Sequence, residues 1–430
     1  MKVLPATQTM ATLSHRTLTL ELPRFTWQEV QDARAGRREC EPARILHHEM
    51  THWYDIVGTV WGQSYLDTLF QAYDAALTHR KTLIEAFPHV LAQFDAERAI
   101  LFPSYFKFVK AGAQPRSGPG TWEMQTTSGV RFRPDGAPNE DDPILFVRFS
   151  EHGTEIARQP ISVGALLEMR ALGAEVAAYG ELRKLRPREE GIVEEAIYNR
   201  DSVELFYHPD LTTYSAAAHL LSNAFSGFAD GTAVMMIGPR LANFALNVTP
   251  TQIRRLKPPP ELEYVGHRRL RGFRDRADRG FLFGCLCFHM RGLAGAGKND
   301  EEALDALLRK AGLPPSEAMF DAAAEYIRTR RPSQLANAHL RRIREAVQTA
   351  GLKILDRRRK PTAMQTADWQ KLPSPVIMDH NAETIFAGES VLSEDDGLFL
   401  ADCSDVLDAT TRAALRAVRG FEFQFTDFVY

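Results

Sequence analysis

Two histidines and a glutamate near the N-terminus have the residue types and spacing that zinc-dependent hydrolysis needs. The segment Ile45–Tyr54 contains His48-Glu49-x-x-His52. On a helix, side chains four residues apart share one face, with Cβ atoms about 5–6 Å apart, so both imidazoles can bind one ion. Zinc accepts imidazole nitrogen at about 2.0–2.1 Å. Glu49 projects next to that face, where it can take a proton from a water on the metal without binding the metal itself.

A helix has to position these side chains, and the surrounding sequence predicts one. Apolar residues recur at helical spacing from Pro42, which suits a first helical position, and Gly58 can end the helix. No proline interrupts the motif, and both of its middle positions are uncharged. The alternative is a histidine pair packed in an aromatic core, since Trp53, Tyr54 and Trp61 are close in sequence.

The stretch around the motif resembles the extended signature of zincin metallopeptidases. Aliphatic residues precede the motif and aromatic residues follow it within Ile45–Tyr54. The resemblance covers this helix and one other, a small part of the chain. It implies that His48 and His52 are zinc ligands and that Glu49 is the general base.

The third zinc ligand does not follow the best-known zincin spacings. Metzincins carry glycine and histidine three and six residues past the second histidine, where this chain has Asp55 and Gly58. The short-spaced gluzincins related to aminopeptidases carry glutamate nineteen residues past it, where this chain has Gln71. The third ligand therefore has to come from further along the chain.

Glu168 is the predicted third ligand. At helical spacing it shares a face with small and apolar residues: Gly164, Ala165, Ala171 and Leu172. A carboxylate on such a face is costly to bury unless it is paired or binds a metal, and small neighbours let two helices approach closely. The stretch is similar to the third-ligand helix of gluzincins, although Leu172 stands where the thermolysin-like subgroup has an aspartate. The alternative is a helix whose exposed carboxylates pair with nearby cations.

Other carboxylates stay open in the site. Glu175, Asp74 and Glu85 are the remaining candidates for the third ligand, and Glu175 is also a candidate to orient a ligand from behind. Asp55 lies one turn past His52 and could orient its imidazole through the second ring nitrogen, or it could be an ordinary surface aspartate.

A hydrolase of this kind also needs a hydrogen-bond donor for the developing oxyanion. Tyrosine and histidine are the usual donors in zincins, and four such residues follow the Glu168 helix: Tyr198, His208, Tyr214 and His219. We select Tyr214 and His208 as the candidate catalytic donors.

Cys285, Cys287 and His289 form a second cluster of ligand-type residues. Alternation would put all three on one face of a strand, where thiolate and imidazole could bind zinc. The run has no matching second pair, since Cys40 and Cys403 are isolated. Free cysteine is also among the most buried residue types, so we predict that this cluster belongs to the core.

Composition narrows the class of protein. The chain has 430 residues, 44% of them hydrophobic and 25% charged, which excludes a disordered chain, and its four cysteines do not make a disulfide framework. The 52 Lys and Arg against 55 Asp and Glu give a net charge of −3 and no global field for nucleic acid or an anionic membrane. The basic runs at 183–186 and 357–360 are predicted to be solvated helix ends. Neither a signal peptide nor a membrane span is evident, so we expect a cytoplasmic protein.

The predicted fold is α+β and mostly helical. Residues 1–250 would form a zincin-like catalytic domain, in which Gly- and Pro-rich turns and a strand-like run predict a β insertion at 112–160. Three consecutive prolines from Pro258 predict a linker, followed by a mostly helical C-terminal domain at 261–430. A second helix is expected from Ser64 to Phe87, closed by Pro88.

The sequence thus favours a zinc metallopeptidase that hydrolyses a protein or peptide substrate, with Glu49 as general base. A partner could regulate it through Arg-rich helices at 328–360 of the C-terminal domain. Two alternatives stay open. One is a non-catalytic regulatory or binding protein that retains a zincin-like fold, and the other is a zinc hydrolase of a non-peptide bond.

Overall fold

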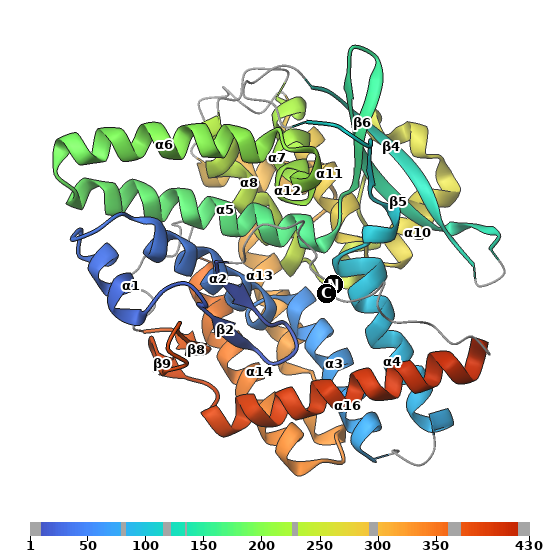
Figure 1. Ribbon diagram of the computed structural model, residues 1–430. Coiled ribbons are helices and arrows are strands. Elements are labelled where there is room, and N and C mark those ends of the chain that lie inside the picture. Colours follow the sequence, from blue (N-terminus) through green and yellow to red (C-terminus); the bar gives the residue numbers. More distant parts are fainter. Residues whose placement is uncertain are drawn as a thin grey trace. The chain divides into compact units, whose positions relative to one another are not determined.

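The computed structural model describes residues 10–78, 83–114, 122–133, 136–225, 231–291, 300–359 and 371–419 (Figure 1). Helices dominate these residues and the strands form small sheets, so the predicted mostly helical α+β fold is confirmed. The alternation at 421–426, which resembles a strand in sequence, lies outside the described residues.

The chain forms two compact units, each discontinuous in sequence. The first comprises Met1–Leu101, Ala177–Arg186 and Tyr326–Tyr430, and the second comprises Phe102–Val176 and Pro187–Glu325. Residues of both predicted domains, 1–250 and 261–430, contribute to both units, and the division into those domains stays a prediction. The three prolines at 258–260 lie inside the second unit, where Pro259 is buried.

The helices of the first unit include α2, which carries the histidine motif. They are α1 (Trp27–Arg34), α2 (Glu41–Val57), α3 (Val60–Thr78), α4 (Leu83–Asp95), α14 (Ala338–Arg358) and α16 (Glu394–Arg419). Helix α16 packs along α3 and α4, and α14 packs against α2 and α3. In Figure 1, α16 is the long red helix that crosses the blue and cyan pair.

A small sheet completes the first unit, in the order β1-β2-β8-β9. Its strands are β1 (Thr12–Leu13), β2 (Thr19–Glu21), β8 (Val376–Met378) and β9 (Thr384–Phe386). Strand β2 pairs in parallel with β8, and the other two pairings are antiparallel. The sheet therefore joins the two ends of the described chain, with β1 at one edge and in contact with α2.

Glycines let α2, α3 and α14 approach closely. A Cβ atom on Gly62 would lie 2.0 Å from the Ile56 carbonyl oxygen, and one on Gly351 would lie 2.4 Å from the Val57 carbonyl oxygen. Real Cβ atoms do not come this close to backbone. The absence of a side chain at these positions is therefore a condition for packing α14 behind the motif helix.

The second unit combines an antiparallel sheet with helices. The sheet has the order β3-β6-β5-β4, with strands β3 (Phe108–Val109), β4 (Glu123–Phe132), β5 (Pro138–Glu151) and β6 (Thr154–Pro160). The helices include α5 (Val163–Leu182), α6 (Arg188–Phe206), α7 (Thr212–Ala224), α8 (Gly231–Asn247), α10 (His267–Asp275), α11 (Arg279–Met290), α12 (Asp300–Lys310) and α13 (Ser316–Arg328). The expected β element at 112–160 is confirmed.

Two expectations about helix ends are wrong. The helix predicted to run from Ser64 until Pro88 is two helices, α3 and α4, and Pro88 lies inside α4. Pro88 is within the first two turns of that helix and is exposed, so its ring faces outward. In the basic run at 357–360, Arg358 is buried rather than solvated.

Within the described residues, none of the helices combines the length and the apolarity that crossing a membrane requires.

Candidate metal centre

Helix α2 begins and ends where its sequence predicts. Pro42 occupies the first turn, and Gly58 caps the C-terminus, where its N–H donates to the Tyr54 carbonyl at 2.8 Å. Residues at helical spacing, Leu46, Met50 and Trp53, are fully buried and fix the rotation of the helix.

That rotation leaves His48 and His52 side by side. His48 is partly exposed and His52 is 7% exposed. Their ring centroids lie 4.8 Å apart with an interplanar angle of 83°. The neighbouring His47 turns the other way and is buried, and this desolvation, together with the charge of Arg34, lowers the pKa of His47 to about 3.

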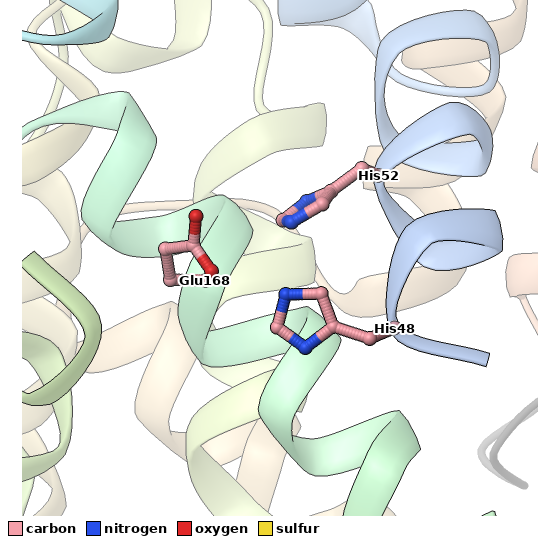
Figure 2. Close-up of side chains that lie close together, drawn as sticks. All are labelled: His48, His52 and Glu168. Carbon is pink, nitrogen blue, oxygen red and sulfur yellow. The ribbon is translucent and has the colours of Figure 1, made fainter. Parts of the chain in front are cut away.

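Glu168 lies on α5 among small apolar residues, as predicted. It is 7% exposed, and Ala165 and Ala171 beside it are fully buried. Its carboxylate points toward the two imidazoles (Figure 2). One ligand atom from each of His48, His52 and Glu168 lies within 4.8 Å of the other two. Helix α5 contributes residues to both compact units, since its last turns belong to the first.

This donor set fits a zinc ion. Two imidazoles and one carboxylate are a set that catalytic zinc sites use, with the fourth position left to water. Ligand atoms on a tetrahedral zinc are about 3.4 Å apart, given bonds of about 2.1 Å. The separation of up to 4.8 Å is about 1.4 Å wider than that, so the three side chains have to move closer together to bind one ion.

Glu49 has a hydrogen bond that the sequence did not indicate. Its Oε2 accepts the backbone N–H of Leu13, in strand β1, at 2.8 Å. Within the described residues no donor contacts the other oxygen, Oε1. Strand β1 therefore holds one carboxylate oxygen in place and leaves the second one available to accept a proton.

Asp55 is not a surface residue. It is completely buried and forms an ion pair and hydrogen bond with Arg358, whose side chain is 1% exposed. The pairing explains why a charged residue of the basic run at 357–360 enters the core: a buried carboxylate needs a partner. Arg358 belongs to α14, so this ion pair ties α14 to the helix that carries His52.

The other candidates for the third ligand lie elsewhere. Asp74 accepts the backbone N–H groups of Ala336 and Asn337, both at 2.8 Å. Glu85 is exposed on α4, and Glu175 is 9% exposed, two turns beyond Glu168 on α5. Of the His, Cys, Asp and Glu side chains in the described ranges, only His48, His52 and Glu168 form a group that could hold a metal.

The candidate oxyanion donors occupy the second unit. The Nδ1 atom of His208 accepts the N–H of Asp210 at 3.2 Å and so caps a short turn. Tyr214 is partly buried on α7. His219 belongs to an aromatic cluster, donates to the Phe206 carbonyl at 2.9 Å, and has its pKa lowered by burial. Tyr214 and His208 stay predictions as donors to the oxyanion.

The cysteine cluster belongs to the core, as predicted, but it lies on a helix and not on a strand. Cys285, Cys287 and His289 are buried in α11, and burial raises the pKa of both thiols. The Nε2 atom of His289 donates to the Lys257 carbonyl at 2.8 Å. The residue that could have indicated a helix here is Asp278, because its side chain accepts the N–H of Phe281 and caps the N-terminus of α11.

Comparison of the chain with protein-family models, curated proteins and solved structures gave no match. The functional interpretation therefore depends on the side chains and their chemistry.

Proposed function

We propose that the chain is a zinc-dependent metallopeptidase of the zincin type, with His48, His52 and Glu168 as the metal ligands. The observation that carries the proposal is the grouping of these three side chains within 4.8 Å. The motif suggested two of them, and small apolar neighbours suggested the third. The motif supplies two histidines, and a catalytic zinc site needs a third protein ligand, which the carboxylate of Glu168 would provide.

Zinc held by these residues would lower the pKa of a water molecule toward about 7. Glu49 would accept a proton of that water on Oε1, while the Leu13 amide holds Oε2. As the water oxygen adds to the peptide carbonyl carbon and the C–N bond breaks, Glu49 would return the proton to the leaving nitrogen. Tyr214 or His208 would donate to the oxyanion in this scheme.

A protein or peptide in a reducing, cytoplasmic setting is the proposed substrate. The reducing setting is supported by the four cysteines, which are all buried and are not joined in disulfides. The Arg-rich helices at 328–360 would bind a regulatory partner. Some of their arginines also form ion pairs within the chain: Arg330, Arg342, Arg344, Arg358 and Arg359.

Metal analysis of chelator-free protein tests the site directly. We expect about one zinc per chain by mass spectrometry and loss or marked weakening of zinc binding in Glu168→Ala. The matched control is Glu175→Ala, on the same helix. Zinc loss in the control alone would move the third ligand to Glu175, and wild-type protein that takes up no zinc would overturn the proposal.

Glu49→Gln separates catalysis from metal binding. The amide cannot accept the proton, so we expect zinc to be retained and cleavage of a peptide library to fall by about 10²–10⁴-fold. Cleavage at the wild-type rate would exclude Glu49 as the base. A zinc-loaded wild type that hydrolyses no peptide would favour a non-peptide substrate.

A further inference from the structure

A second candidate site lies in the first unit, in a cavity that the metallopeptidase proposal does not use. It has a volume of about 570 Å³, which is within the range of small-molecule sites. The lining residues come from α3, α4, the segment before α14, and α14 itself. Arg344 and Arg358 are fourteen residues apart on α14, or about 21 Å along its axis. The cavity is therefore separate from the Asp55–Arg358 contact beside the motif.

Two arginines of the lining share a single carboxylate. Arg344 donates from Nε and Nη2 to one oxygen of Asp67, at 3.0 and 2.6 Å. Arg330 pairs with the other oxygen of Asp67 at 2.8 Å. Two guanidinium groups against one carboxylate leave one positive charge in excess, at a place where the Arg344 side chain is 1% exposed.

The arginine pair also has unused hydrogen-bond donors. Nη1 of Arg344 and Nε of Arg330 are buried and have no hydrogen-bond partner. A buried N–H without a partner costs about 1–3 kcal/mol, and more when the group is charged. Both N–H groups are enclosed, so an anion in the cavity would act on them through its negative charge, which offsets the excess positive charge of the arginines.

The second lining carboxylate, Asp74, also carries a negative charge, but Arg331 belongs to the same lining, so three arginines still face two carboxylates. Asp74 uses both of its oxygens on the backbone N–H groups of Ala336 and Asn337. At the exposed part of the lining, Arg331 and His89 add cationic or polar character. No ion pair or side-chain hydrogen bond of Arg331 is found among the described residues.

The same cavity has an apolar side. Phe70 and Leu335 are buried there, together with Ala75. We propose that the cavity binds a small organic anion, whose carboxylate or phosphate group is held by Arg330 and Arg331, with the charge of the buried Arg344 behind them, while its apolar part packs on Leu335 and Ala75. Guanidinium groups match the planar fork of a carboxylate and the oxygens of a phosphate equally well.

Calorimetric titration with three ring-bearing probes tests the site and separates the two anion types. Phenyl phosphate carries the phosphate, benzoate carries the carboxylate, and benzamide is neutral. We expect saturable binding of phenyl phosphate, benzoate or both, weakening as salt is raised, and no binding of benzamide. Binding of benzamide as tight as that of the anions would overturn the proposal, as would the absence of binding by both anions.

Arg331→Ala tests the cationic lining without touching the buried pair. Loss of one charge-assisted hydrogen bond predicts affinity about 10-fold weaker. The matched control is Arg416→Ala, which removes an exposed arginine on α16 outside the cavity and should bind as the wild type does. Equal affinity in both variants would contradict the assignment.

A third variant keeps this test independent of the metal. Anions also bind to zinc, so the titrations are repeated in His52→Ala. Unchanged anion binding there supports the cavity whether or not the chain is a peptidase. Anion binding that disappears in His52→Ala would assign the anion to the metal centre and overturn the inference.

Discussion

Helices α2 and α11 both carry metal-ligand side chains a few residues apart, but they present them differently. On α2, His48 and His52 are four residues apart, which offsets them by about 40° around the helix axis. On α11, Cys285 and Cys287 are two residues apart, about 160° around the axis, but Cys285 and His289 are four residues apart and share a face as His48 and His52 do. Spacing alone therefore does not distinguish the two helices.

Burial distinguishes the two helices. Every residue of α11 from Arg279 to Met290 is buried, and burial raises the pKa of both thiols, so the thiolates that bind zinc are disfavoured. On α2, His48 remains partly exposed and so can exchange metal and water. Ligand-type residues close in sequence therefore define a metal site only when the helix period and the exposure agree.

The largest expected effect tests this contrast directly. His52→Ala removes one of the three proposed ligands and should weaken zinc binding by more than about 100-fold, since changes in outer-shell partners alone cost about 10–100-fold. Cys287→Ser is the matched change on α11 and should leave the zinc content unaltered. Metal analysis of both purified variants provides the measurement. Zinc lost from Cys287→Ser and kept in His52→Ala would reverse the comparison.

The second-largest expected effect is a loss of stability, and it tests which interactions hold α2 and α11 in place. Helix α2 is held partly by the buried Asp55–Arg358 ion pair, whereas apolar packing surrounds α11. Arg358→Met leaves a buried carboxylate without its partner and should lower the free energy of unfolding by about 3–5 kcal/mol. Denaturant unfolding measures this.

The double variant Asp55→Asn with Arg358→Met is the control for that prediction. It removes the stranded charge, so part of the lost stability should return. A double variant less stable than Arg358→Met would mean that Asp55 stabilises the chain mainly through other contacts.

The smallest expected effect is on the pH dependence of stability. It concerns His219, a buried histidine of the second unit, in contrast to the His48–His52 pair. Burial lowers the pKa of His219 in the folded state. Below about pH 6.5 the unfolded chain binds a proton at His219 that the folded chain does not bind. The free energy of unfolding therefore decreases as the pH is lowered. The slope contributed by this group is at most about 1.4 kcal/mol per pH unit, and above pH 6.5 it vanishes.

His219→Phe keeps an aromatic ring in the cluster and removes the titrating group. Urea unfolding of this variant and the wild type between pH 5 and pH 7.5 gives the two slopes. We expect the free energy of unfolding of the variant to decrease less than that of the wild type between pH 7.5 and pH 5, because His219 no longer titrates. Identical slopes in both proteins would assign the pH dependence to other groups.

Local sequence patterns predicted the parts of the site that local physics decides. Helix α2 begins at its proline and ends at Gly58 as expected, because both residues act through their own backbone. Glu168 could be selected because burial of a lone carboxylate among small residues is costly. The β element at 112–160 followed from Gly- and Pro-rich turns and a strand-like run, whereas β3 at Phe108–Val109 lies outside the predicted range.

Long-range contacts were beyond those patterns. Nothing near Leu13 indicates that its N–H donates to Glu49, and nothing near Arg358 indicates Asp55 as its partner, since the pairs are separated by 36 and 303 residues. Pro88 was expected to end a helix because proline usually does, but it lies near the start of α4, facing outward. Tertiary packing decided each of these outcomes.

The close approach of α2, α3 and α14 has a consequence for inheritance in descendants of this chain. A lineage without the proposed metal chemistry would no longer need His48 and His52 as ligands. It could not readily replace Gly62 or Gly351, since any Cβ there would meet backbone oxygen at 2.0 or 2.4 Å. In a set of diverged descendants, these glycines should outlast the histidines.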